Sequence, residues 1–276
     1  MPRPSREQWD ALAAFWERFE ADGLRPEHVA EAGGRLESPC VVVGSGLGVL
    51  CEALTQTGVE SVTGVDFSPA MVERSRAIRG VEAVVASADR LPFEDAEIGS
   101  VVIATGVLDP SDRQALARVW SELGRAVRPG GTVVAGFFDP GAGLREFLDG
   151  SGILDEDGVH RTDRIVELWR LRESTEELAP RLAIWAQTEL SPAQGVLERI
   201  EPFLDGWFES LDATAEYLHQ VGVEAPEAHL ARCLDWGEPA LDNPEDAFVG
   251  ADAWFEHVTV RRFDRDSITV FELTRS

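Results

Sequence analysis

Three glycines at alternate positions, Gly44, Gly46 and Gly48, follow the apolar run 41–43 and precede a segment with helical spacing. A loop of this kind between a strand and a helix brings backbone N–H groups together, and residues without a Cβ let a ligand approach closely. Asp66 lies about 20 residues further on, at the end of the next apolar run, where a carboxylate can accept both hydroxyls of a ribose. This spacing predicts a site for a nucleotide-like ligand.

The elements that must position this site can be predicted from residue 40 onwards. Short β-branched runs alternate there with helical patterns, which is typical of βαβ units. We expect strands at 41–43, 61–66, 83–86, 100–105 and 132–138, and helices at 47–57, 69–78 and 111–127. Right-handed crossovers then predict a doubly wound, Rossmann-like α/β sheet. Two alternating runs around the turn 264–266 predict a hairpin that completes the sheet at seven strands.

The rest of the chain suggests a division into three parts. Residues 140–250 have helical patterns, contain no convincing strand and are too long for a simple connection. We expect N-terminal helices within 1–37 (at 5–20 and from Pro26), a ligand-binding domain made of 38–139 and 251–276, and a helical cap at 140–250. The cap, inserted after the fifth strand, is expected to recognise the substrate. It could instead form a dimer interface, so both a monomer and a homodimer remain open.

The composition of the chain limits the kinds of molecule that we expect it to bind. The formal net charge of −25 repels phosphate backbones and anionic membrane surfaces, which argues against nucleic acid and membranes. No run approaches the roughly 18 apolar residues of a membrane span, and the first residues lack the apolar core of a signal peptide. Cys40, Cys51 and Cys233 form no CxxC pair, so neither a metal site nor a disulfide framework is indicated. We expect a cytoplasmic protein that acts on a small molecule.

Three further segments follow the glycine loop in order: VTGVDFSPAMVERSR at 62–76, ADRLPFED at 88–95 and LGRAVRPGGTVVAGFF at 123–138. Together they resemble the class I S-adenosylmethionine-dependent methyltransferases, in particular the small-molecule branch typified by ubiquinone and menaquinone biosynthesis enzymes. The resemblance covers about residues 38–138, and the C-terminal hairpin fits that family's sixth strand and its reversed seventh strand. A nicotinamide-dependent oxidoreductase is disfavoured because Val49 follows Gly48, so the loop lacks GxGxxG spacing.

The resemblance implies S-adenosyl-L-methionine as the cofactor and S-adenosyl-L-homocysteine as its product. It implies that the glycine loop receives the methionine part, that the carboxylate after the second strand holds the ribose, and that the segment after the third strand edges the adenine amino group. Two side chains of the DxSxxM segment would flank the adenine, and the segment after the fourth strand would lie beside the methyl group. The implied cofactor-binding residues are Gly44, Ser45, Gly46, Gly48, Asp66, Phe67, Met71, Ser87, Ala88, Asp89 and Thr105.

Methyl transfer from a positive sulfur requires alignment and exclusion of water, so no dedicated catalytic residue is obligatory. Three residues are candidates for handling an acceptor's proton. His160 and His219 lie in the expected cap, and Asp109 follows the fourth strand. Each has a structural alternative: a surface or core role for the histidines, and helix capping for Asp109. The predicted reaction is O-, N- or C-methylation of a small metabolite.

The chain departs from the family's motifs at three positions. The acid of the first motif is replaced by Val42, the aspartate before LPF by Ser87, and the aspartate that opens the fourth strand by Gly99. These departures leave an alternative function open. The protein could bind the cofactor on this fold without methylating anything, in a cyclase or binding role.

Overall fold

The structure, a computed structural model, describes residues 24–31, 36–104, 106–108, 112–138, 244–263 and 268–276. Shorter described stretches lie within 5–13, at 159–161, within 212–219 and at 237–239. The chain divides into two compact units. One consists of Asp22–Asp139 with Leu241–Ser276, and the other of Met1–Ala21 with Pro140–Ala240.

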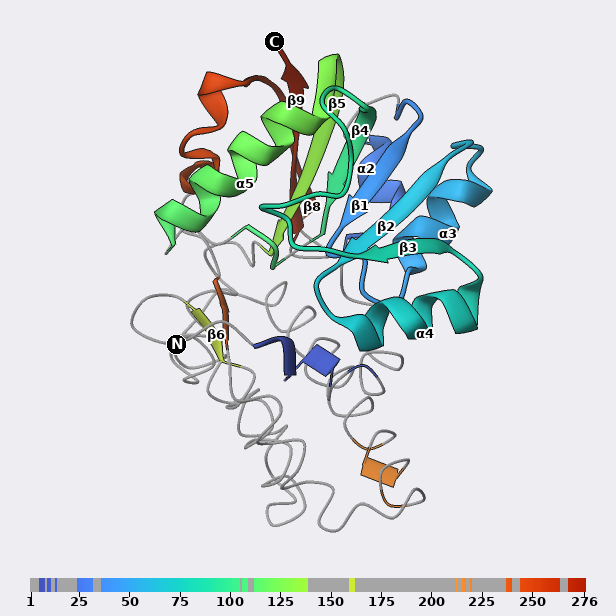
Figure 1. The fold of residues 1–276 in the computed structure, drawn as a ribbon. Helices are drawn as coiled ribbons and strands as arrows, with labels where there is room; N and C mark the ends of the chain where they lie inside the picture. The colour runs from blue at the N-terminus through green and yellow to red at the C-terminus, as the bar shows by residue number, and fades with distance from the viewer. Residues whose placement is uncertain are drawn as a thin grey trace. The chain divides into compact units, whose positions relative to one another are not determined.

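The larger unit contains a seven-stranded sheet in the order β3-β2-β1-β4-β5-β9-β8 (Figure 1). The first five strands run parallel, whereas β9 runs antiparallel to both of its neighbours. This confirms the predicted doubly wound α/β sheet with a reversed last strand. The strands are β1 (Cys40–Val43), β2 (Val62–Asp66), β3 (Glu82–Val85), β4 (Ile98–Ile103), β5 (Val127–Phe138), β8 (Phe255–Phe263) and β9 (Ile268–Arg275).

Two helices of this unit begin at a side chain that caps them. The hydroxyl of Ser68 accepts the Met71 N–H at 3.2 Å, Pro69 occupies the first turn, and Gly80 ends the helix with a φ of 66°. Asp112 caps the long helix before β5 by accepting the Ala115 N–H at 2.8 Å. The elements are α2 (Pro26–Glu31), α3 (Val49–Gln56), α4 (Pro69–Arg79), α5 (Arg113–Ala126) and the short 3-10 helices η3 (Pro244–Phe248) and η4 (Ala251–Ala253).

Both faces of the sheet are covered by apolar residues, which explains the uninterrupted valine run of β1. α5, η3 and η4 pack on one face around the fully buried Trp120, and α2 and α3 pack on the other. Cys40 and Cys51 belong to the second face, where burial raises the pKa of both thiols to about 12. Both are free thiols, as predicted, whereas Cys233 lies outside the described residues.

The smaller unit is described only in short pieces, and these correct one expectation. β6 (Val159–Arg161) and β7 (Gly237–Pro239) pair antiparallel, although we expected no strand between 140 and 250. Three-residue strands are too short to show the alternation on which strand prediction relies. At the N-terminus, the described residues 6–7, 9–10 and 13 are helical, within the helix expected at 5–20. Among the described residues, no helix is long and apolar enough to cross a membrane.

A close contact between α5 and Trp254, the residue between η4 and β8, gives a first stability prediction. A Cβ added to Gly124 would lie 2.3 to 2.8 Å from atoms of the Trp254 indole, and Cζ of Arg275 lies 4.9 Å from the centroid of that ring. We expect Gly124→Ala to lower the free energy of unfolding by about 2 kcal/mol, because the added methyl group overlaps the indole and one of the two must shift. Urea unfolding measures this.

The matched test is the same change in a Trp254→Ala background. With the indole absent, Gly124→Ala should instead stabilise α5 by about 0.5 kcal/mol or more, since alanine is the better helix former. An equal loss in both backgrounds would show that the clash is not the cause.

Candidate functional site

The glycine loop follows β1 at the carboxyl end of the parallel strands, where ligands of doubly wound sheets bind. Its three glycines have φ values of 73°, 50° and 82°, a region that favours glycine. The N–H groups of Gly44 and Ser45 donate to the Val65 carbonyl at 2.8 and 3.1 Å, and the Gly48 N–H donates to the Ser45 carbonyl at 2.8 Å. The loop is therefore folded back onto the end of β2.

Several N–H groups of the loop, which we expected to converge on a ligand, are thus bonded within the protein. The Gly46 N–H is also engaged, because it donates to a carboxylate oxygen of Asp66 at 2.9 Å. Within the part of the chain that is described, no hydrogen bond reaches the carbonyl oxygen of Gly44 or of Gly46. These oxygens are acceptors, so they suit a cationic donor better than an anion.

Asp66 is the last residue of β2 and is only 8% exposed. Its Oδ2 accepts the Gly46 N–H and its Oδ1 accepts the Ser68 N–H, both at 2.9 Å. The carboxylate is thus fixed between the glycine loop and the start of α4. A carboxylate oxygen can accept more than one hydrogen bond, which is the chemistry that recognition of paired hydroxyls requires.

Neighbouring segments pack closely against the loop at Gly44 and Ser45. A Cβ on Gly44 would lie 2.3 Å from Cγ2 of Val107, in the segment that follows β4. The Ser45 side chain is directed toward β2, where a Cβ on Gly64 would lie 2.7 Å from its hydroxyl oxygen. That hydroxyl is buried and has no hydrogen-bond partner among the described residues. Ser45 therefore faces the protein interior rather than the mouth of the loop.

This orientation predicts an unusual result for Ser45→Ala. Removing a buried hydroxyl that has no partner removes a desolvation cost of about 1–3 kcal/mol, so we expect stability to be unchanged or higher. Cofactor affinity should also stay within about twofold, since no contact is lost. Thermal unfolding and a cofactor titration check the two parts, and a clear loss of affinity would mean that the hydroxyl turns toward the ligand.

The segment after β3 contains the predicted residues Ser87, Ala88 and Asp89. The Ser87 hydroxyl donates to Oδ1 of Asp89 at 2.6 Å, and Arg118 of α5 lies 3.2 Å from Oδ2. The Ser87 hydrogen bond and then the Arg118 contacts lower the pKa of Asp89, against the opposing effect of burial. Asp89 thus places a carboxylate next to the position where the family has its aspartate.

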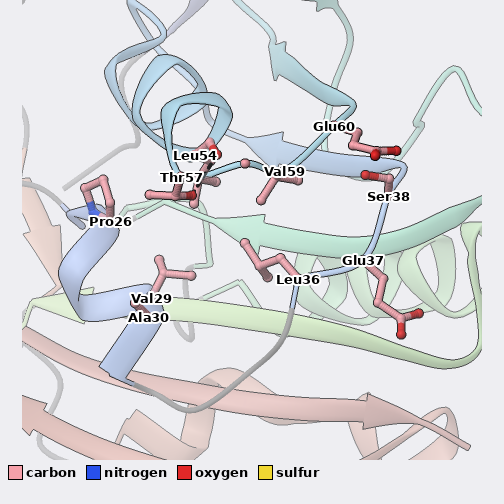
Figure 2. Close-up of a pocket in the computed structure, with 11 residues that line it drawn as sticks. Pro26, Val29, Ala30, Leu36, Glu37, Ser38, Leu54, Thr57, Val59 and Glu60 are labelled. Atoms are coloured by element: carbon pink, nitrogen blue, oxygen red, sulfur yellow. Dashed lines mark hydrogen bonds between the residues drawn. The ribbon is translucent and has the colours of Figure 1, made fainter.

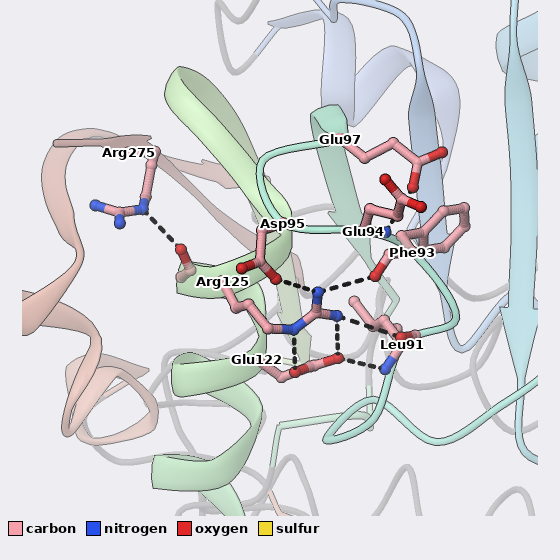
Figure 3. Close-up of polar contacts among 9 residues, drawn as sticks. Leu91, Phe93, Glu94, Asp95, Glu97, Glu122, Arg125 and Arg275 are labelled. Carbon is pink, nitrogen blue, oxygen red and sulfur yellow. Dashed lines mark hydrogen bonds and ion pairs between the residues drawn. The ribbon is translucent and has the colours of Figure 1, made fainter.

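Residues 91–95 are held by an ion pair of α5 (Figure 3). Glu122 accepts the Leu91 N–H at 2.7 Å and two hydrogen bonds from Arg125, at 2.7 and 2.9 Å. Arg125 also donates to the carbonyls of Leu91 and Phe93 and to Asp95. Sequence reasoning missed this pair, although charges at positions 118, 122 and 125 share one helix face, a pattern that could have indicated it.

The Glu122–Arg125 pair predicts an acid sensitivity. Hydrogen bonds from Arg125 and then from Leu91 hold the pKa of Glu122 below its usual value. A carboxylate with a lowered folded pKa stabilises the protein above its unfolded pKa of about 4.3, and this contribution disappears as the pH falls through the folded value. We expect Glu122→Gln to be destabilising at pH 7 and the difference from wild type to shrink below about pH 4.

Urea unfolding at a series of pH values measures this dependence. The control is Glu73→Gln, at an exposed position of α4, which should follow the wild-type curve. A constant difference between Glu122→Gln and wild type across the series would contradict the assignment.

The other motif departures lie at different places in the fold. Val42 is fully buried in the apolar cluster on the α3 face. Gly99 lies at the amino end of β4, and a Cβ there would be 2.7 and 2.8 Å from the carbonyl oxygens of Glu37 and Ser38. Gly99 is therefore explained by close backbone packing at the end of the sheet away from the glycine loop.

The remaining predicted residues fall into two groups. Phe67 and Ala88 are half-buried in the segments after β2 and β3, and Met71 is a buried residue of α4, so all three lie in segments that border the site. Thr105 and Asp109 lie outside the described residues. His160 is in β6 and the exposed His219 is in a helical stretch, and both belong to the smaller unit. All these assignments stay predictions.

A cavity of about 640 Å³ lies at the other end of the sheet (Figure 2). It is lined by α2, by the C-terminal end of α3 and by the segments before β1 and β2. Because these segments enter the parallel strands at their amino ends, the cavity is separate from the candidate site. None of the predicted cofactor residues lines it.

Comparisons with known proteins agree with this arrangement. Residues 41–135 match a family described as "Methyltransferase domain". An uncharacterized protein of Mycobacterium tuberculosis is 35% identical over 115 residues, which is 40% of this chain and 40% of the relative. The demethylmenaquinone methyltransferase of Staphylococcus saprophyticus is 36% identical over 89 residues, which is 31% of this chain and 36% of that enzyme. The chain thus spans well under half of the length of these relatives.

Solved structures share the fold. A protein described as a SAM-dependent methyltransferase from Methanosarcina mazei has a TM-score of 0.55 at 14% identity, covering 91% of this chain and 99% of that chain. A protein from Pyrococcus horikoshii has a TM-score of 0.52 at 15% identity, covering 95% and 89%. Residues 41–135 thus match a methyltransferase domain whose cofactor is S-adenosylmethionine, and the sheet has the Rossmann-like fold of class I methyltransferases.

Proposed function

We propose that this protein transfers the methyl group of S-adenosylmethionine to an oxygen, nitrogen or carbon atom of a small metabolite. The observation that carries the proposal is the joint placement of the glycine loop and Asp66. They lie at the carboxyl ends of adjacent strands β1 and β2 and are joined by the Gly46–Asp66 hydrogen bond. The methyltransferase domain around them supports the same reaction class.

The chemistry of these groups fits the cofactor. The methionine part of S-adenosylmethionine carries an ammonium group, for which the Gly44 and Gly46 carbonyl oxygens are suitable acceptors. The carboxylate of buried Asp66 would accept hydrogen bonds from the two ribose hydroxyls. Val42 is apolar, and backbone oxygens of the loop would take over the contact that an acid makes in related proteins.

When bound, the cofactor supplies a methyl group that positive sulfur has already activated. The chain then has to hold the acceptor in line and exclude water, which favours transfer without a covalent enzyme intermediate. For an oxygen or nitrogen acceptor, Asp109, His160 or His219 would receive the proton. We also propose that residues 140–250 form the cap that recognises the acceptor, in a monomer or a homodimer.

A second candidate function is cofactor binding without methylation. Val42 favours it, because a fully buried valine provides no charged contact where related enzymes have an acid. The two candidates differ in product rather than in binding.

The experiment supplies tritium-labelled methyl groups. The full chain is incubated with S-adenosyl-L-[methyl-³H]methionine and a heat-inactivated whole-cell extract, the labelled products are separated by size, and Asp66→Asn is the control. We expect labelled small products and S-adenosylhomocysteine with wild type and neither with the variant. Cofactor binding without any labelled product would support the second candidate, and label confined to macromolecules would exclude a small-molecule acceptor.

A further inference from the structure

One face of α5 carries Arg118, Glu122 and Arg125 at i, i+4 and i+7, which we call the α5 polar stripe. The stripe contacts the post-β3 segment, residues 86–96, at several points. Arg118 holds Asp89, Glu122 holds the Leu91 N–H, and Arg125 holds the carbonyls of Leu91 and Phe93. In addition, the Ala96 N–H donates to the Arg125 carbonyl at 2.9 Å. A single helix thus fixes most of this segment.

The other end of the post-β3 segment is attached to the cofactor site. The Ala86 N–H donates to the Asp66 carbonyl at 2.9 Å, and Asp66 and Val85 are register partners of β2 and β3. The segment therefore leaves the sheet directly beside the carboxylate that we assign to the ribose. A change in how α5 holds this segment would alter the surface next to Asp66.

We propose that the α5 polar stripe is a positioning element for recognition of the cofactor's adenine. It acts through the post-β3 segment, whose residues Ser87 to Asp89 would face the exocyclic amino group. This inference rests on the proposed cofactor site, and it assigns part of the adenine selectivity to residues that do not touch the cofactor.

A substitution at Arg118 can distinguish an effect on adenine recognition from an effect on folding. Its side chain is 56% exposed and that of Asp89 is 32% exposed, and ion pairs of this kind contribute little to stability. The same pair completes the Ser87–Asp89–Arg118 hydrogen-bond chain that shapes the start of the segment. Arg118→Met should therefore leave the fold intact and loosen the segment where the adenine edge is expected.

The experiment compares two ligands by calorimetry: S-adenosylhomocysteine and S-inosylhomocysteine, which has an oxygen in place of the adenine amino group. We expect wild type to prefer the adenosyl compound and Arg118→Met to reduce that preference about fivefold, with an unchanged thermal midpoint. The control is Arg128→Met, which removes the same charge from an exposed ion pair with Glu37. Arg128 follows α5 in the chain and makes no described contact with the post-β3 segment, so its variant should keep the wild-type preference.

Three outcomes would overturn the inference while cofactor binding stands. They are an unchanged preference in Arg118→Met, an equal reduction in Arg128→Met, and a wild type that binds both compounds equally well. If wild type binds neither compound, the proposed function itself fails, and the inference fails with it.

Discussion

Asp66→Asn is expected to weaken S-adenosylhomocysteine binding about 100-fold, which corresponds to losing charge-assisted hydrogen bonds worth roughly 3 kcal/mol. Two effects combine. The amide lacks the charge that binds the ribose hydroxyls, and it can accept only one of the two N–H groups that Gly46 and Ser68 now donate to the carboxylate. One buried donor then loses its partner, and the glycine loop loses its attachment to β2.

Asp112→Asn is a closely matched control for this variant. Asp112 also accepts a backbone N–H, and asparagine is an equally good N-cap, so helix α5 should be unaffected. The two variants have the same net charge, and competition binding with S-adenosylhomocysteine compares them directly. Equal affinity in Asp66→Asn and Asp112→Asn would exclude Asp66 as the ribose ligand.

Trp120→Ala is expected to lower the free energy of unfolding by about 3–5 kcal/mol, the largest stability effect that we predict. Trp120 is fully buried, and its ring centroid lies 5.5 Å from that of Phe248 and 5.7 Å from that of Phe255. Its Nε1–H donates to the Ala247 carbonyl at 2.8 Å. This indole therefore attaches α5 to η3 and to the start of β8.

Trp120→Phe distinguishes the contribution of packing to stability from that of the hydrogen bond to Ala247. It retains an aromatic ring but leaves the buried Ala247 carbonyl without its donor, so we expect a smaller loss, of about 1–3 kcal/mol. Urea unfolding of both variants measures the series. If Trp120→Ala and Trp120→Phe were equally destabilised, the hydrogen bond rather than the packing would account for the effect.

The sheet could be predicted because local patterns determine most of it. The glycine loop, Asp66 and the caps Ser68 and Gly80 are local signals, and the observed bounds of β1, β2 and α4 lie within one residue of those expected. β5 differs more, since it begins at Val127 rather than at 132. Its pairing with β4 is irregular between these residues, and residues 128–131, which we expected before the strand, lie inside it.

Long-range contacts account for most of what could not be predicted. The direction of the loop N–H groups depends on the carbonyl of Val65 and the carboxylate of Asp66, which approach the loop only after β1 and β2 have paired. Gly99 looked like a lost acid of the cofactor site. It is instead a position where the backbone of Glu37 and Ser38 leaves no room for a side chain.

The role of the α5 polar stripe could not be predicted for the same reason. Its charges can be read from the sequence, but a helical stripe of alternating charge is typical of a solvent-exposed surface. Only the folded chain brings Glu122 and Arg125 against the post-β3 segment. Such long-range contacts determine which charged side chains of the helix help to position the site.

Calorimetric titration of the full wild-type chain with S-adenosylhomocysteine, and separately with NAD⁺, tests the central claim most directly. The claim is that the glycine loop and Asp66 form a binding site for S-adenosylmethionine. We predict saturable binding of one S-adenosylhomocysteine per chain and no binding of NAD⁺. Absence of S-adenosylhomocysteine binding, or saturable binding of NAD⁺ instead, would contradict it.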